Sequence, residues 1–279
     1  MPLLLLANAV DSADLSLLPG LFRVLEQDFG IGPQELSMLV VSQSVLKGLA
    51  YPVWGVLADR FDRRSALWQA CVAWGLASAV VAVASRFLVM VVCLAAGGVA
   101  LACLMPVSQS IMSDIIPAPQ RGTAFGHMAL AGNIGGLLGG ALSTTTSEWV
   151  VLGFRGWRFS FALVAVLSLL LAPIVRLHIV EPPHQSEGRR GVRRVGLQEQ
   201  LVLIFSRRTF ILLVCQGVVG NMPWVAFDSF GVLWLQYIGF SNGTVAQMMI
   251  MRRLGSGLGS AFGGWLSDRL FSVMGDSGE

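Results

Sequence analysis

Three ionisable residues lie inside long apolar stretches of the sequence. Asp11 and Asp14 are three residues apart, so in a helix they share one face. At 1.5 Å per residue Asp11 lies roughly 12 Å from the start of its helix, and Lys47 lies at a similar depth in the next stretch. A charge at the centre of a membrane span costs at least about 2.5–3.5 kcal/mol. We therefore expect an Asp11–Lys47 pair that carries a proton, contacts a solute or simply neutralises itself.

A second set of charged residues lies in the last two apolar stretches. Asp228 lies in one of them, and Arg252 and Arg253 lie in the other. An ionisable residue inside a span indicates a functional site by default, and of the two arginines we place Arg252 on the expected pathway. The alternative is structural, because long arginine side chains reach a membrane interface without touching a solute.

One short string occurs twice in the sequence, 209 residues apart. Gly55-Val-Leu-Ala-Asp59-Arg60 ends one apolar stretch, and Gly264-Trp-Leu-Ser-Asp268-Arg269 ends another. In both places glycine-containing apolar sequence runs directly into an Asp-Arg pair. The repeat predicts two homologous membrane-embedded halves, each with a charged hinge at the membrane surface.

The residues that follow the first copy indicate a gate. Arg63 and Arg64 come directly after it, and Asp114 ends a neighbouring apolar stretch. We expect Asp114 to pair with one of these arginines and to hold one conformational state. Plain anchoring by positive residues is the alternative, but it explains neither Asp59 nor Asp268.

Composition places most of the surface in lipid. Hydrophobic residues make up 54% of the chain and charged residues 13%, whereas a soluble domain carries about 25% charged residues. The net charge of +3 is no evidence for nucleic acid, because the arginines sit in short loops. The cysteines lie in apolar stretches without metal-ligand spacing and are expected to be buried small hydrophobes. We expect neither an enzyme nor a cofactor or metal, since no catalytic constellation, P-loop or dinucleotide fingerprint is found.

Eight stretches are long enough to span a membrane, which takes roughly 20 mostly apolar residues. Their approximate ranges are 3–22, 36–58, 65–84, 87–115, 122–142, 158–177, 209–238 and 244–266. The fourth contains Pro106 and the seventh contains Pro223, so we expect both to be tilted or kinked.

The spans divide into two unequal groups. We expect residues 1–177 to form a six-helix bundle, residues 178–208 a basic cytoplasmic linker, and residues 209–279 a partial second bundle of two helices. With the N-terminus in the cytoplasm, twelve arginines fall on the inner side and four on the outer side, which favours this orientation. If the second half mirrored the first, four more helices would follow, so the sequence reads as truncated.

Several further motifs accompany the repeated string. They are Asn8-Ala-Val-Asp11, Pro106-Val-Ser-Gln-Ser-Ile-Met-Ser-Asp114, Arg121-Gly-Thr-Ala-Phe-Gly126, Gly156-Trp-Arg-Phe-Ser-Phe161 and Gln216-Gly-Val-Val-Gly-Asn-Met-Pro-Trp224. Together with the repeat they resemble the major facilitator superfamily over nearly the whole chain. The last motif is similar to its spinster-like branch. The resemblance implies an all-α integral membrane fold, with a complete N-terminal six-helix bundle and the first two helices of the C-terminal bundle.

The resemblance also implies where function would lie. Together with the charges inside the spans, it gives as the expected substrate or ion pathway Asn8, Asp11, Asp14, Lys47, Gln216, Asn221, Trp224, Asp228 and Arg252. In a cytoplasmic gate it places Gly55, Asp59, Arg60, Arg63, Arg64, Asp114, Arg121, Gly264, Asp268 and Arg269. Many proton-coupled members carry an arginine in the fourth helix, where this chain has Leu94. Either Lys47 substitutes for that arginine or transport is not driven by protons.

Glycines recur every four residues in two of the predicted helices. One series is Gly132, Gly136 and Gly140, and the other is Gly255, Gly259 and Gly263. Small residues at this spacing allow backbones to approach closely. We expect these faces to meet across the two halves, where they would serve either rocking or static packing.

The expected function is secondary active or facilitative transport of a small organic or lipid-like solute by alternating access. Expected partners are that solute, protons in the coupled case, and membrane lipids, but no nucleic acid; the oligomeric state is left open. The alternative is a truncated, non-transporting membrane protein that associates with full-length carriers or regulates them.

Overall fold

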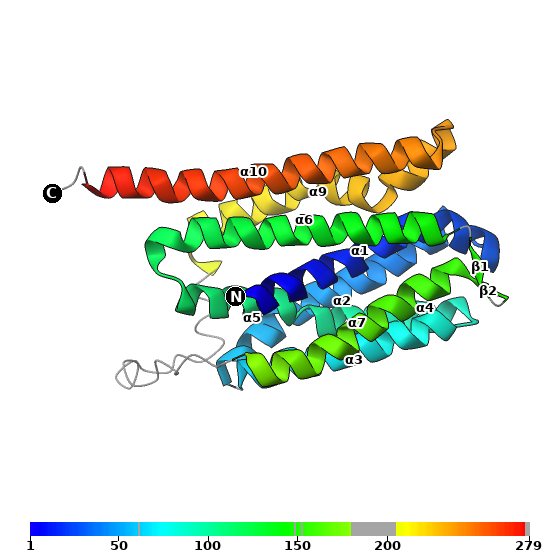
Figure 1. Cartoon of the computed structure of the whole chain (residues 1–279), viewed down its shortest axis with the longest axis horizontal. Coiled ribbons are helices and arrows are strands. Elements are labelled where there is room, and N and C mark those ends of the chain that lie inside the picture. The colour runs from blue at the N-terminus through cyan, green and yellow to red at the C-terminus, as the bar shows by residue number, and fades with distance from the viewer. Residues whose placement is uncertain (61, 148, 152, 180–204, 277–279) are drawn as a thin grey trace.

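The structure is a computed structural model. It describes residues 1–60, 62–147, 149–151, 153–179 and 205–276, and for residues 56, 58–60, 151, 242 and 272–276 it describes the backbone alone. The predicted linker 178–208 therefore lies largely outside the described residues. Within them the chain is almost entirely helical and forms a bundle of long, roughly aligned helices (Figure 1).

The helices follow the predicted spans closely. They are α1 (Pro2–Phe29), α2 (Pro33–Arg60), α3 (Arg63–Val83), α4 (Phe87–Leu101), α5 (Leu104–Ile115), a short 3-10 turn η1 (Ala118–Gln120), α6 (Arg121–Thr146), α7 (Gly156–His178), α9 (Arg208–Ile238) and α10 (Asn242–Asp276). A two-stranded antiparallel hairpin of β1 (Val150–Val151) and β2 (Phe154–Arg155) precedes α7. This confirms the predicted architecture of six N-terminal spans followed by two more.

Pro106 and Pro223 lie in the two spans predicted to be tilted or kinked, and the structure treats these two spans differently. The fourth span breaks into α4 and α5 at Ala102 and Cys103. Pro106 has no N–H to donate to the Ala102 carbonyl, and its ring crowds that oxygen, so the helix is interrupted just before the proline. By contrast, α9 runs through Pro223 without a break.

Six helical segments among the described residues are long and apolar enough to cross a membrane: Pro2–Phe29, Pro33–Gly55, Arg63–Val83, Phe87–Ile115, Gly156–His178 and Arg208–Ile238. The glycine-rich helices α6 and α10 are long enough but fall outside that set. Large apolar side chains cover the outer surface, and Met251 is 77% exposed and Val219 70% exposed. A water-soluble protein rarely exposes so much contiguous apolar surface, whereas lipid accepts it.

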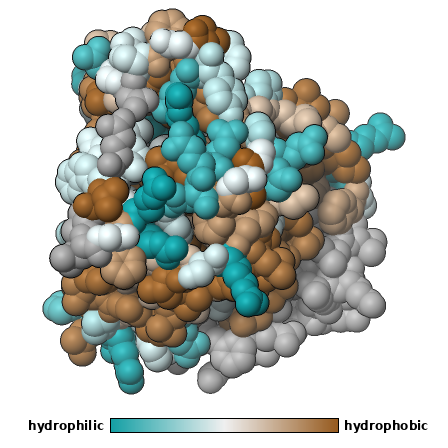
Figure 2. Space-filling model, turned by 90° about the vertical axis from the view of Figure 1, so that its right-hand side faces the viewer, coloured by the Kyte–Doolittle hydropathy of each residue, from teal (hydrophilic) through white to brown (hydrophobic). Residues whose placement is uncertain are grey.

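The two ends of the bundle differ from its sides. One end, here the Met1 end, carries the start of α1, the α2–α3 turn, the η1 turn and the end of α10; the other, the hairpin end, carries β1 and β2 (Figure 1). Figure 2 looks onto the hairpin end and shows hydrophilic residues gathered over its middle, with hydrophobic residues around them. This distribution suits a bundle whose sides face lipid and whose ends face water.

The hydrophobic core lies inside the first six spans. Its largest fully buried side chains are Trp74, Trp157, Phe22 and Phe161. Among the described residues α9 adds only Leu233 to this core, and α9 is buried only from Gly231 onward. The C-terminal pair of helices therefore packs on the outside of an already cored bundle.

Candidate functional site

The predicted pair between the first two helices is present. Lys47 Nζ lies 3.2 Å from Asp11 Oδ1, and the two side chains are only 11% and 8% exposed. Asp11 comes from α1 and Lys47 from α2. An ion pair removed from water in this way depends on its partner, because each charge alone would be strongly unfavourable there.

A second carboxylate lies beside this pair. Asp14 is 4% exposed and has Gln43 and Trp74 as neighbours. Within the described part of the chain, however, Asp14 Oδ1 and Trp74 Nε1 each lack a hydrogen-bond partner. The α1–α2 charge cluster, meaning Asp11, Asp14 and Lys47, thus holds two carboxylates against one ammonium group. A single bound proton would balance it.

The third predicted pathway residue of α1 has a structural contact. Asn8 is buried, and its Nδ2 donates to the Met128 carbonyl of α6 at 2.7 Å. A Cβ on Gly132 would lie only 2.9 Å from this Asn8 amide nitrogen. Asn8 therefore fastens α1 to α6 at a place where the glycine leaves room.

The second predicted set also comes together. Arg252 Nη2 lies 2.5 Å from Asp228 Oδ1, joining α10 to α9. Arg253 points the other way and donates from Nη2 to Ser16 Oγ of α1 at 2.8 Å. From the sequence, Arg252 alone was placed on the pathway. The two arginines are adjacent and so leave the helix about 100° apart, which gives them different partners.

Three predicted pathway residues do not join either set. Gln216, Asn221 and Trp224 lie on the exposed part of α9, and Trp224 is 62% exposed. Asn221 Nδ2 donates to the Gly217 carbonyl of its own helix. Their place on a pathway stays a prediction.

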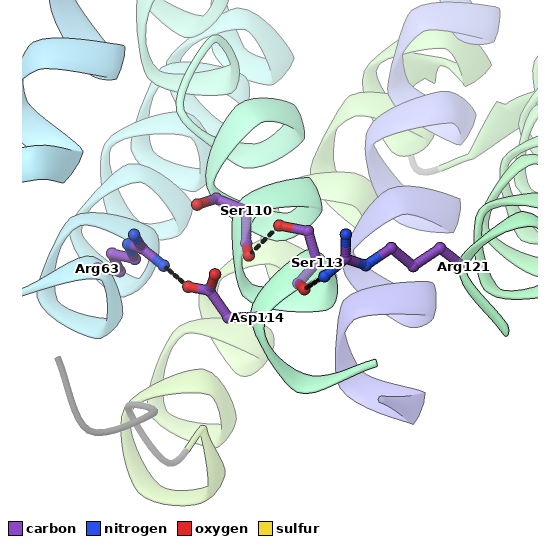
Figure 3. A network of polar contacts seen from close by, with 5 residues as sticks. All are labelled: Arg63, Ser110, Ser113, Asp114 and Arg121. Atoms are coloured by element: carbon purple, nitrogen blue, oxygen red, sulfur yellow. Dashed lines mark hydrogen bonds and ion pairs between the residues drawn. The ribbon is translucent and has the colours of Figure 1, made fainter. Parts of the chain in front are cut away.

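The predicted gate pair at the Met1 end is present as well. Arg63 Nη1 at the start of α3 lies 2.6 Å from Asp114 Oδ2 near the end of α5, as Figure 3 shows. Arg64 contributes its backbone N–H to the Asp62 side chain, which caps α3. The pair therefore ties two helices within the N-terminal bundle.

Arg121 closes the end of α5 by a different contact. Its Nη2 donates to the Ser113 carbonyl at 2.8 Å (Figure 3). Its Nε donates to the Ile116 carbonyl at 3.1 Å. The last carbonyls of a helix have no partner within the helix, and a guanidinium there satisfies them and complements the helix dipole.

The second copy of the repeated string makes one of the contacts between the two groups of helices. Asp268 near the end of α10 accepts hydrogen bonds from the backbone N–H groups of Gly122, at 2.8 Å, and Thr123, at 2.6 Å. These are free donors in the first turn of α6, where a negative charge is favoured. Hydrogen bonds from the Thr123 side chain and then from both N–H groups lower the pKa of Asp268, which lies beyond the predicted span.

The two glycines of the repeat have different surroundings. A Cβ on Gly264 would collide with the Gly122 carbonyl, so α10 approaches α6 as closely as it does only because residue 264 is glycine. A Cβ on Gly55 would meet nothing within 4 Å. The side chains of Asp59 and Arg60 lie outside the described residues, and Arg269 stacks over Trp265 at 5.3 Å from the ring centroid.

The helices predicted to meet through glycines do meet, but mostly through other glycines. In α10 a Cβ on Gly255, Gly259 or Gly263 would meet nothing within 4 Å, whereas Gly257 and Gly264 face α6. In α6, Gly122 and Gly126 approach the α10 backbone and Gly136 faces an α10 side chain, while Gly135 and Gly139 abut the α1 backbone. The prediction therefore holds for Gly136 and was wrong for the series in α10, because spacing alone does not show which face of a helix meets its neighbour.

Sequence reasoning missed two buried members of the first site. Gln43 lies four residues before Lys47 and hence on the same helical face, which was a usable signal. Trp74 comes from α3 and gave no signal, because a tryptophan in an apolar span is ordinarily a packing residue.

Known transporters share the sequence pattern and the fold. The sequence profile of the Major Facilitator Superfamily matches residues 4–275. The galacturonate transporter of Dickeya chrysanthemi is 22% identical over 87% of this chain and 73% of its own length. The quinolone resistance protein NorA of Staphylococcus aureus is 24% identical over 73% of this chain, and the hexuronate transporter of Bacillus subtilis is 25% identical over 66%. The chain spans only 50% and 42% of these last two proteins.

Solved structures agree on the fold. A bacterial homologue of the human lysosomal transporter Spinster, in an inward-facing conformation, superposes with a TM-score of 0.72 at 19% identity, over 93% of this chain and 58% of that one. A D-xylose–proton symporter superposes with a TM-score of 0.68 at 17% identity, over 90% of this chain and 64% of that one. With a family profile matching almost from end to end and its long helices arranged in that family's fold, this multi-pass membrane chain belongs to the Major Facilitator Superfamily.

Proposed function

We propose that the chain belongs to a carrier that moves a small organic or lipid-like solute by alternating access. The observation that carries this proposal is the contact of Asp268 with the first turn of α6. It joins the two groups of helices at the Met1 end through a few hydrogen bonds to a helix terminus. Such a contact can break and reform as a unit, which is what a gate requires.

The α1–α2 charge cluster supports coupling to protons. Asp11 and Asp14 share a buried site with the single ammonium of Lys47. Burial favours the electrically balanced form of such a cluster, so uptake and release of one proton would accompany a change in its exposure to water. The relatives differ in the solutes that their names state, so they do not select one for this chain.

The finer family assignment and the orientation form part of the same proposal. Likeness to the Spinster homologue in fold, together with the Gln216–Trp224 motif, supports the spinster-like branch. The arginine-rich loops support a cytoplasmic Met1 end. Residues 1–177 would then form one moving unit and residues 209–279 part of the other.

The chain spans 42% to 73% of the length of the relatives described above. The alternative function is a non-transporting membrane protein that associates with longer carriers. Reconstitution into proteoliposomes separates the two functions. Saturable, pH-dependent uptake from a panel of galacturonate, xylose and lysophospholipid supports the carrier, whereas no uptake of any of them by the purified chain favours the associating protein.

The gate predicts a local change in hydrogen exchange. In Asp268→Ala the amides of Gly122 and Thr123 lose their acceptor, so their exchange should rise by roughly 5- to 100-fold. Hydrogen–deuterium exchange read by mass spectrometry on the first turn of α6 measures this directly. Because the folded pKa of Asp268 is depressed, its contribution is complete above the ordinary value of 3.8 and is lost only as the pH falls through the folded value.

Glu35→Ala is the matched control for this experiment. Glu35 Oε2 also accepts a backbone N–H at a helix start, from Gly32 at 3.0 Å, but within the N-terminal bundle and at the hairpin end. It should leave exchange in α6 unchanged. If the amides of Gly122 and Thr123 exchanged equally fast in the wild type and in Asp268→Ala, the proposed gate contact would be contradicted.

A further inference from the structure

The two carboxylates of the α1–α2 charge cluster differ in their partners. Asp11 Oδ1 lies 3.2 Å from Lys47 Nζ, so an ammonium group already neutralises this carboxylate. Asp14 is 4% exposed, and its Oδ1 has no hydrogen-bond partner among the residues that the structure describes. When both carboxylates are ionised, the negative charge that remains unbalanced therefore falls on Asp14.

Asp14 lies where a lone negative charge is most unfavourable. At 1.5 Å per residue it is roughly 18 Å from the start of α1, and the apolar core of a bilayer is about 30 Å thick, so the carboxyl is near the midplane. The charged groups that act on it are Asp11 on its own helix and Lys47 from α2. Cys71 of α3 acts on Asp11. Within the described part of the chain, Asp14 therefore shares its one nearby cation with Asp11.

Two neutral neighbours offer Asp14 hydrogen-bond donors. Gln43 of α2 and Trp74 of α3 lie beside it and are 5% and 1% exposed. An indole N–H can only donate, yet Trp74 Nε1 has no acceptor among the described residues. An unmatched donor thus lies beside an unmatched acceptor. A hydrogen bond to an ionised carboxylate is roughly twice as strong as one between neutral groups, so the indole should bond to Asp14 more strongly when Asp14 is ionised.

The backbone of α4 keeps both neighbours in place. A Cβ on Gly98 would lie 2.5 Å from the Gln43 carbonyl oxygen and 3.1 Å from Gln43 Cγ. A Cβ on Gly97 would lie 3.9 Å from Trp74 Cδ1. Two consecutive glycines of α4 therefore let α2 and α3 pack closely on it, and the side chains of Gln43 and Trp74 stay beside Asp14.

We propose that Asp14 is the residue that takes up and releases the proton, that Asp11 stays ionised as the partner of Lys47, and that Trp74 is a positioning residue for ionised Asp14. The inference rests on the proposed coupling to protons and assigns that coupling to one carboxyl. The proton adds to a carboxylate oxygen of Asp14, the cluster becomes electrically neutral, and the bond from the indole N–H weakens. Each proton thus changes a link between α1 and α3.

The indole signals of the purified chain test this assignment without requiring transport. The chain has eight tryptophans, and isotope labelling of their side-chain nitrogen gives one NMR signal for each in detergent micelles. Trp74→Phe identifies the Trp74 signal by its loss. Between about pH 5.5 and 9, where ordinary carboxylates remain ionised, we expect the Trp74 signal to shift along a single titration curve.

Trp157 is the matched control within the same spectrum. Its Nε1 also faces a carboxylate, since it donates to Asp28 Oδ2 at 2.7 Å, and like Trp74 it is buried. Asp28, however, lies at the hairpin end and is paired with Arg155 at 2.9 Å. The Trp157 signal should therefore keep one position over the same range of pH.

Two variants should hold the Trp74 signal at opposite ends of its curve. Asp14→Asn has no carboxyl to ionise, so the signal should stay near its low-pH position at every pH. Asp11→Asn leaves Lys47 to Asp14, so Asp14 should remain ionised and the signal should stay near its high-pH position. An unchanged Trp157 signal in both variants shows that the fold is retained.

A Trp74 signal that keeps one position in the wild type, or that still titrates in Asp14→Asn, would overturn the assignment to Asp14. The coupling itself is tested separately, by uptake into proteoliposomes. Uptake that depends on pH while the Trp74 signal stays fixed would contradict the assignment alone. A titrating Trp74 signal with uptake that does not depend on pH would contradict the coupling and keep Asp14 as the residue that binds the proton.

Discussion

Replacing Lys47 by methionine should lower the free energy of unfolding of the chain by about 3–5 kcal/mol. The change removes the only ammonium group of the α1–α2 charge cluster and leaves Asp11 and Asp14 buried without it. The cost comes from the uncompensated carboxylates and not from lost packing, since methionine nearly matches the length of the lysine stem. Equilibrium unfolding in mixed micelles, followed by helical circular dichroism, measures the difference.

Two further variants show whether the loss comes from buried charge. Adding Asp11→Leu to Lys47→Met should recover most of the stability, because a buried pair replaced by apolar residues of similar volume costs little. Arg155→Met is the matched control. It breaks an ion pair of 2.9 Å with Asp28 in which Arg155 is 54% exposed, and should cost under about 1 kcal/mol. Equal losses for Lys47→Met and Arg155→Met would contradict a buried cluster.

Contacts near helix ends and at matching depths could be predicted from the sequence. Asp11 and Lys47 lie at similar distances from the same membrane surface, and a charge at that depth has few partners other than an opposite charge. The Arg63–Asp114 pair follows in the same way, because both residues lie where apolar stretches end on the same side. In each case residue counting gives the depth of the charged side chain in the membrane. That depth leaves few possible partners for the charge.

Contacts that depend on how a helix is turned about its axis could not be predicted. The glycines of α10 that meet α6 are Gly257 and Gly264, and the regular series starting at Gly255 faces away. Both series have small residues, so the spacing alone does not choose between them. Asp268 likewise bonds to backbone N–H groups of α6, and backbone donors leave no mark in the sequence. Which face of a helix is buried depends on the neighbouring helix, and the sequence of the helix alone does not show it.

The packing of α1 against α6 predicts a large effect from a single methyl group. Gly135→Ala should lower the free energy of unfolding by about 1–3 kcal/mol or more, because the new Cβ would lie 2.6 Å from Ala9 Cα and would also collide with the Ala9 carbonyl. Both are backbone atoms, so no rotamer change relieves the clash and the two helices must separate. The interface has small residues so that the backbones can touch.

Gly140→Ala in the same helix separates this clash from the effect of changing any glycine. A Cβ at residue 140 meets nothing within 4 Å, and alanine is favoured over glycine in a helix by about 1 kcal/mol. Gly140→Ala should therefore leave stability unchanged or raise it slightly. The two variants add the same atom to the same helix, five residues apart, and should move the unfolding midpoint in opposite directions. If both variants stabilised the chain equally, α1 and α6 could not be in backbone contact at Ala9. The close approach of the two helices, which also brings Asn8 and Ser16 of α1 against α6, would then be contradicted as well.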